Sequence, residues 1–322
     1  MVKLIIQIPC YNEENSLDVT LSSLPSRISG IDIVERLIID DGSTDRTVEV
    51  ALSHGVEHIV RFPRHQGLAK AFMAGLDACL RAGADIIVNT DADNQYSADD
   101  IPKLIEPILS GKAELVVGAR PIADIEHFSP LKKFLQKIGS WAVRLASRTD
   151  IPDVPSGFRA MSREAAMKLN VFNEYTYTLE TIIQAGQKNM AISSVPVRTN
   201  KDLRPSRLVK SIPSYIRRSI ITIVRIFMTY KPFEFFAFPG IIAFGVGMLL
   251  GLRFLYFYIT SGGAGHIQSV ILTALLMGIG SSLIVVGLVA DLISVNRKLL
   301  EKLDYRLHQI EEIWRQNNTN GE

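Results

Sequence analysis

The sequence predicts an α/β protein, in which a Rossmann-like, mostly parallel sheet domain is followed by a two-helix transmembrane hairpin. Two observations carry this prediction. Over the first 120 residues or so, short aliphatic runs alternate with longer stretches of helical periodicity, the pattern of parallel strands joined by right-handed crossovers. After residue 234, two apolar runs are each long enough to cross a bilayer.

The elements follow in order along the chain. Strands are expected at residues 3–8, 33–39, 58–62, 85–89 and 114–117, with helices between them at 13–24, 45–54, 68–82 and 98–109. Beyond Val117 the pattern is looser. Helices are expected there at 131–147, 163–168 and 178–187, and a strand at 191–197.

The apolar runs cover residues 235–259, interrupted only by Arg253, and residues 267–290, which contain no charge. Their connector carries no Lys or Arg, whereas residues 198–231 hold nine. The positive-inside rule therefore places both termini in the cytoplasm. The alternative is a pair of buried core helices.

Four segments are expected from these patterns. They are a cytoplasmic catalytic domain over 1–210, an amphipathic juxtamembrane helix over 211–232, the two transmembrane helices within 233–295, and a cytoplasmic helical tail over 296–322. An apolar stripe in the tail indicates either an oligomer contact or a face that lies on lipid.

Composition narrows the function. The net charge of +2 gives no reason to expect a nucleic-acid partner, and two cysteines in apolar segments indicate buried thiols in a reducing compartment. The mean hydropathy of +0.18 is high for a chain with 21% charged residues, and the apolar excess lies in the two spans.

Acidic pairs follow two of the expected strands. Asp40-Asp41-Gly42-Ser43 comes after one aliphatic run, and Asp91-Ala92-Asp93-Asn94-Gln95 after another. In extended backbone, residues i and i+2 point to the same side, so Asp91 and Asp93 can converge on one cation. Oxygen ligands of this kind suit Mg²⁺ or Mn²⁺ that is also held by substrate phosphates. An Asp-x-Asp alone is a weak signal.

The order of the motifs is more specific. Pro9-x-Tyr11-Asn12-Glu13-Glu14, the two acidic segments, Gly118-Ala119-Arg120 and Ser156-Gly157-Phe158-Arg159 together resemble the family 2 glycosyltransferases of the GT-A fold. The resemblance is to the polyprenyl-phosphate branch, which includes dolichol-phosphate mannose synthases and the bacterial enzymes that glucosylate undecaprenyl phosphate. It covers residues 1–210.

The resemblance implies an inverting, membrane-anchored enzyme. It would transfer one hexose from a UDP- or GDP-sugar to an undecaprenyl or dolichyl phosphate at the cytoplasmic leaflet, with Mg²⁺ or Mn²⁺. A homo-oligomer is compatible with the helical tail. Two alternatives remain: a transferase acting on a polysaccharide or another lipid, and a catalytically silent membrane scaffold. The Gln-x-x-Arg-Trp motif of processive polysaccharide synthases does not occur in the sequence.

The resemblance also assigns roles to individual residues. The metal ligands would be Asp91, Asp93 and Gln95. The nucleotide-sugar would contact Pro9, Tyr11, Glu13, Asp40, Asp41, Asp91, Ala92, Gln95, and Arg204 and Arg207 in a loop that is shorter than the family's. The catalytic group would comprise Asp93, Arg120, Asp153 and Glu180.

Each of these residues could instead have a purely structural role. Asp40-Asp41-Gly42-Ser43 can be an Asx-type turn, Arg120 a solvated cation, and Asp153 or Glu180 a helix cap or ion-pair partner. His65 is expected to be an ordinary loop residue, with a nucleotide contact as the alternative. An acceptor phosphate with a second pKa near ~6 is largely ionised already, so Asp153 is expected to position the acceptor or sugar rather than to act as a base.

Overall fold

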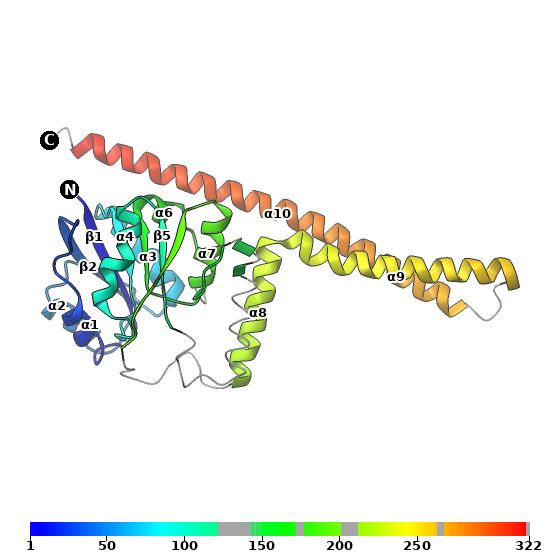
Figure 1. Cartoon of the computed structure of the whole chain (residues 1–322), viewed down its shortest axis with the longest axis horizontal. Coiled ribbons are helices and arrows are strands. Elements are labelled where there is room, and N and C mark those ends of the chain that lie inside the picture. The colour runs from blue at the N-terminus through cyan, green and yellow to red at the C-terminus, as the bar shows by residue number, and fades with distance from the viewer. Residues whose placement is uncertain are drawn as a thin grey trace. The chain divides into compact units, whose positions relative to one another are not determined.

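The computed structural model describes residues 1–121, 143–144, 146–147, 149–171, 177–200, 212–262 and 267–319. By its internal contacts the chain divides into two compact units. One contains Met1–Ser219 with Glu311–Glu322, and the other contains Ile220–Ile310. The first unit holds a seven-stranded sheet, and the second holds long apolar helices (Figure 1).

The sheet is mostly parallel, as the sequence predicts. Its strands are β1 (Lys3–Cys10), β2 (Ile33–Asp40), β3 (His58–Arg61), β4 (Ile86–Asn89), β5 (Leu115–Ala119), β6 (Arg159–Ser162) and β7 (Ile192–Pro196). Their order across the sheet is β3-β2-β1-β4-β6-β5-β7. Parallel pairing joins β1 to β2 and β4, β2 to β3, and β5 to β7.

The strand β6 was not predicted. It runs antiparallel between β4 and β5, with Arg159 opposite both Asn89 and Val117. The first three of its four residues are buried, so the alternation of buried and exposed positions that marks a half-buried strand is missing. Its place in the sheet depends on neighbours far away in the sequence.

The helices of the first unit lie close to their predicted positions. They are α1 (Leu17–Ser23), α2 (Thr47–Ser53), α3 (Leu68–Arg81), the short 3₁₀ helix η1 (Ala98–Asp100), α4 (Ile101–Leu109), α6 (Arg163–Lys168) and α7 (Thr178–Gln187). Helix α3 packs against β1 and β2, and α4 packs against β5 and β6. The helix expected over 131–147 lies almost wholly outside the described residues.

Helix α1 begins later than the sequence suggested. The carbonyl of Glu13 accepts hydrogen bonds from the amides of Ser16 and Leu17, and the Glu13 amide donates to Oγ1 of Thr47. Residues 13–16 therefore form a turn tied to the next loop rather than a first helical turn.

The C-terminal helices are α8 (Ile212–Tyr230), α9 (Pro232–Ser261) and α10 (Ile267–Thr319). Two of them, α9 and α10, are long and apolar enough to cross a membrane. They pack closely where two glycines meet, since a Cβ at Gly280 would lie 2.7 Å from the carbonyl oxygen of Gly240. Large apolar side chains such as Phe238 and Ile271 are exposed on their outer faces, which fits a transmembrane hairpin.

Helix α10 continues from its apolar half into its charged half without a break. The boundary predicted between the second span and the helical tail therefore coincides with a change of composition and not with the end of a helix. Helix α8 lies within residues 211–232, where the sequence predicts an amphipathic juxtamembrane helix.

Candidate active site

The candidate site lies at the carboxyl ends of three adjacent parallel strands. β1 lies between β2 and β4, and the sheet grows outward from β1 toward β3 on one side and toward β6 on the other. Open α/β sheets bind ligands in the crevice at such a switch point. A cavity of about 320 Å³ opens at this edge.

The cavity gathers most of the predicted site residues, which come from four separate segments of the chain. Those that line it are Pro9, Tyr11, Glu13, Asp41, Asp91, Ala92, Asp93, Gln95 and Arg120. The lining is completed by residues to which sequence analysis gave no role or only a minor one: Cys10, His65, Leu68, Ala71, Tyr96 and Pro155.

The carboxyl groups of Asp91 and Asp93 lie on the cavity wall, with the guanidinium of Arg120 on the same wall. Burial, together with the charge of Asp93, raises the pKa of Asp91 to about 7. Such a pair is stabilised by a proton or by a cation. The oxygen-rich set of Asp91, Asp93 and Gln95 fits Mg²⁺ or Mn²⁺.

These side chains would leave part of a cation's shell open. Within the described ranges, no group of three or more His, Cys, Asp or Glu side chains is placed to hold a metal ion. Mg²⁺ is commonly held by one or two carboxylates together with substrate phosphates and water. The site therefore fits a cation that is shared with a phosphate-bearing ligand.

An aromatic pair borders the same cavity. The ring of His65 stacks on the ring of Tyr11, with centroids 4.1 Å apart, and its Nδ1 lies 2.9 Å from Oδ2 of Asp41. Asp41 also accepts hydrogen bonds from the amides of Gln66 and Gly67, at 2.7 and 2.9 Å. Asp41 thus holds the loop that presents His65, which the sequence had indicated to be an ordinary loop residue.

Asp40 and Asp41 have different surroundings. Oδ1 of Asp40 accepts the amide of Ser43 at 2.9 Å, and Oδ2 lies 3.3 Å from Nε of Arg61. Asp40 is fully buried and is not on the cavity wall. Asp40 therefore has the structural role of the Asx-type turn, which was the alternative for this segment. Asp41 instead faces the cavity.

Arg120 and Asp153 form a partly buried ion pair with two hydrogen bonds between the side chains. Arg120 donates from Nε to Oδ2 at 2.7 Å and from Nη2 to Oδ1 at 3.0 Å, and its amide also reaches Oδ2 at 3.1 Å. Burial lowers the pKa of Arg120, but hydrogen bonding to Asp153 outweighs it and raises that pKa above its ordinary value. Arg120 lines the cavity, and Asp153, fully buried, does not.

Tyr96 connects the acidic loop to the segment around Gly157. Its hydroxyl accepts the Gly157 amide at 3.1 Å, its ring stacks on Phe158, and the guanidinium of Arg120 lies 5.9 Å above it. Burial raises the pKa of Tyr96 to about 12, so the hydroxyl stays neutral. Tyr96 follows the Asp-x-Asp closely, but its spacing alone gave no sign of this position.

Arg159 is a buried residue that binds the backbone of the preceding segment. It is fully buried, its Nε donates to the carbonyl of Ser156 at 2.8 Å, and its Nη2 donates to that of Val154 at 2.7 Å. Burial lowers the pKa of Arg159 to about 10. The motif that contains it therefore shapes the segment below the cavity.

The remaining predicted residues are Glu180, Arg204 and Arg207. Glu180 is buried on α7, where Nε2 of Gln184 donates to its Oε1 at 3.5 Å, and it is not among the residues lining the cavity. Arg204 and Arg207 lie outside the described residues.

Known proteins share this architecture. The structure resembles glucosyl-3-phosphoglycerate synthase from Mycobacterium tuberculosis, crystallised with Mn²⁺ and UDP, with a TM-score of 0.54 and 20% identity over 69% of this chain and 80% of that one. This likeness confirms the GT-A fold.

Sequence relatives point the same way. A UDP-N-acetylglucosamine–dolichyl-phosphate N-acetylglucosaminyltransferase of Methanococcus voltae is 31% identical over 217 residues, covering 60% of this chain and 83% of the relative. An undecaprenyl-phosphate mannosyltransferase of Micrococcus luteus is 25% identical over 235 residues, covering 70% and 93%. Residues 5–169 match the model of glycosyl transferase family 2. The chain belongs to that family.

Proposed function

We propose that this protein is a membrane-anchored glycosyltransferase that moves one hexose from a UDP- or GDP-sugar to a polyprenyl phosphate at the cytoplasmic leaflet. The observation that carries the proposal is the convergence of Asp91 and Asp93, the Tyr11–His65 pair and Arg120 on one cavity. These groups match the three parts of the reaction, which are the diphosphate, the nucleoside and the transferred sugar with its acceptor.

The donor side of the cavity supports nucleotide binding. Tyr11 and His65 offer a stacked aromatic surface beside the carboxylate of Asp41. A base and ribose on this side would bring the diphosphate toward Asp91, Asp93 and Gln95. A divalent cation held there would neutralise the departing diphosphate.

The transfer itself needs positioning more than proton removal. A phosphate oxygen of the acceptor attacks the anomeric carbon, while the bond from that carbon to the β-phosphate oxygen breaks and releases the nucleoside diphosphate. The acceptor phosphate is already largely ionised at neutral pH. Arg120, held by Asp153, is a fixed cation that can orient a phosphate at the cavity. We assign Asp153 the role of positioning Arg120.

The apolar helices support a membrane location. The acceptor is a lipid whose phosphate lies at the bilayer surface, and a hairpin formed by α9 and α10 would keep the enzyme there. The Lys and Arg residues of the segment 198–231 favour a cytoplasmic catalytic unit and cytoplasmic termini.

The test is sugar transfer by the purified protein in detergent. Labelled UDP- and GDP-sugars are offered with polyprenyl phosphate and Mg²⁺ or Mn²⁺, and Asp93→Asn is the control variant. Transfer of one sugar to lipid, lost in the variant, is the expected result. Donor binding without lipid product would refute the acceptor, and absence of metal-dependent nucleotide binding would favour a silent scaffold.

A further inference from the structure

The loop that carries Asp93 and Gln95 is held from outside the cavity by a short segment that follows β7. Residues 198–200 run antiparallel to residues 95–97, with a bridge between Thr199 and Tyr96. The amide of Ser97 donates to the carbonyl of Arg198 at 3.1 Å, and the amide of Asn200 donates to that of Gln95 at 2.9 Å. About a hundred residues separate the two segments in the sequence.

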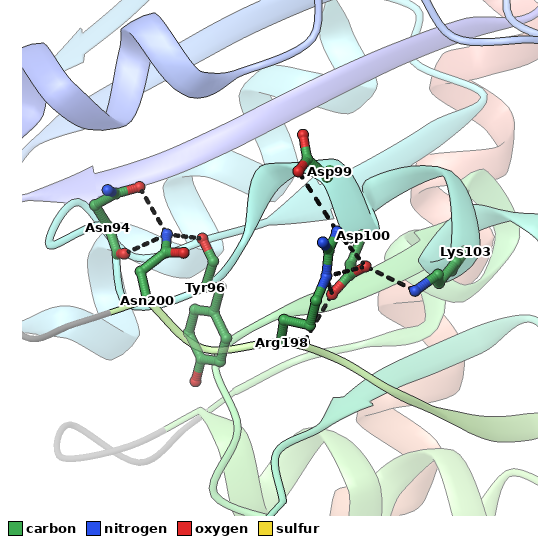
Figure 2. Close-up of polar contacts among 7 residues, drawn as sticks. All are labelled: Asn94, Tyr96, Asp99, Asp100, Lys103, Arg198 and Asn200. Carbon is green, nitrogen blue, oxygen red and sulfur yellow. Dashed lines mark hydrogen bonds and ion pairs between the residues drawn. The ribbon is translucent and has the colours of Figure 1, made fainter.

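The side chain of Asn200 adds a second layer of contacts. Its Nδ2 donates to the carbonyls of Asn94 at 2.9 Å and of Tyr96 at 3.3 Å, as Figure 2 shows. Asn94 has a φ of 55°, in the left-handed region that non-glycine residues adopt infrequently. One amide group therefore holds the two carbonyls on either side of Gln95, where the loop turns sharply.

Arg198 anchors the other end of this segment. Its amide donates to Oδ2 of Asp100 at 2.7 Å, and its guanidinium contacts both carboxylate oxygens, with Nη2 3.0 Å from Oδ1 (Figure 2). Asp100 is fully buried at the start of α4 and also binds Nζ of Lys103 at 2.9 Å. Arg198 thus ties residues 198–200 to a rigid helix end.

The inner side of the loop faces the site. Asp93, Gln95 and Tyr96 line the cavity, and Oδ1 of Asp93 accepts the Gln95 amide at 3.2 Å. Residues 198–200 therefore bind the backbone of this loop on the side away from the cavity, while its side chains line the cavity. Displacing the backbone at Gln95 or Tyr96 would move those side chains.

We propose that Arg198 and Asn200 are positioning residues that hold loop 93–97 in the conformation that receives a divalent cation and its nucleotide. The inference rests on the proposed function, because it concerns the same cation. Without this support the loop would have to be ordered at the moment of binding, and that ordering free energy would be subtracted from the affinity. A deficit of this kind raises the KM for metal but leaves kcat unchanged at saturating metal, whereas loss of a ligand raises the KM and also lowers the kcat that saturating metal can reach.

The experiment uses the full-length protein in detergent and follows free Mn²⁺ by electron paramagnetic resonance in the presence of UDP or GDP. For Asn200→Ala we expect the Kd for Mn²⁺ to rise on the order of tenfold, which corresponds to about 1.4 kcal/mol. Asn200→Asp keeps the shape and removes the donor, so it should behave like Asn200→Ala. Arg198→Ala should shift the Kd in the same direction.

Two controls separate positioning from general destabilisation. Asn296→Ala makes the same substitution at an exposed position of α10 and should leave the Kd unchanged. Excess Mn²⁺ should restore the kcat of Asn200→Ala, with the melting temperature close to that of the parent. A loss that excess Mn²⁺ does not restore, or an unchanged Kd, would overturn the proposal.

A second measurement keeps the inference independent of the proposed function. Amide hydrogen exchange of the metal-free protein should quicken at residues 95–97 in Asn200→Ala and stay unchanged in Asn296→Ala. If the parent protein binds no Mn²⁺ in the presence of either UDP or GDP, the proposed function fails. The exchange rates then decide by themselves whether Asn200 holds the loop, and unchanged rates would refute it.

Discussion

A Cβ atom at Gly157 would lie 2.8 Å from Oδ2 and 2.9 Å from Oδ1 of Asp91. The backbone of residue 157 is thus the surface against which the Asp91 carboxylate rests. No side chain fits at residue 157 unless that carboxylate moves. The Ser156-Gly157-Phe158-Arg159 motif therefore needs a glycine at residue 157, because the carboxylate of Asp91 occupies the space that a side chain would take.

Gly157→Ala should weaken metal binding with little loss of stability. The end of the Asp91 side chain can move aside, but a catalytic group misplaced by about 1 Å can lower activity by about 10²-fold. Mn²⁺ titration and thermal melting measure the two effects. Gly245→Ala is the matched control, because nothing lies within 4 Å of its Cβ position. A normal Kd for Mn²⁺ in Gly157→Ala would show that Asp91 is not a ligand.

Asp153 should act through Arg120. Asp153→Asn and Arg120→Gln should each lower the rate of transfer by about 10²–10³-fold, the range seen when a preorganised charge is lost. The double variant should be no slower than the slower single variant, since residues that act as a unit are not additive. Single-turnover rates check this. Additive losses would mean that Asp153 has a separate role, such as that of a base.

Asp100 should make stability depend on pH. Burial raises its pKa, but hydrogen bonds from Arg198 and Lys103 outweigh this and hold the pKa at about 2. The unfolded value is about 3.9, so this contribution is complete above that pH and is lost as the pH falls toward 2. The difference in melting temperature between the parent and Asp100→Asn should therefore narrow below pH ~4. A difference that stays constant with pH would show that ionised Asp100 does not stabilise the fold through Arg198 and Lys103.

The helical hairpin offers a matched pair of glycines. A Cβ at Gly280 would lie 2.6 Å from the backbone nitrogen of Phe244, whereas nothing lies within 4 Å of a Cβ at Gly278. Gly280→Ala should destabilise the packing of α9 on α10 by about 1–3 kcal/mol, as overpacking does. Gly278→Ala should not. Thermal melting in detergent compares them, and equal melting temperatures would refute this helix contact.

Much of the fold could be predicted because local patterns report local burial. The aliphatic runs at β1, β2 and β4 indicated buried parallel strands, and the acids that follow β2 and β4 indicated a cation site at the ends of these strands. The short strand β6 lacked such a pattern. Its pairing with β4 and β5 depends on contacts that no local window contains.

The sequence by itself determined the alternation of strands and helices, the two apolar spans, and the presence of acids at the ends of two strands. Only the tertiary structure decided the partners: Asp153 on Arg120, His65 on Tyr11, and Asn200 on the loop around Gln95. The physical reason is the range of the forces involved. Periodicity and hydropathy act between near neighbours, whereas ion pairs, ring stacking and backbone bridges join whichever loops the sheet order brings together.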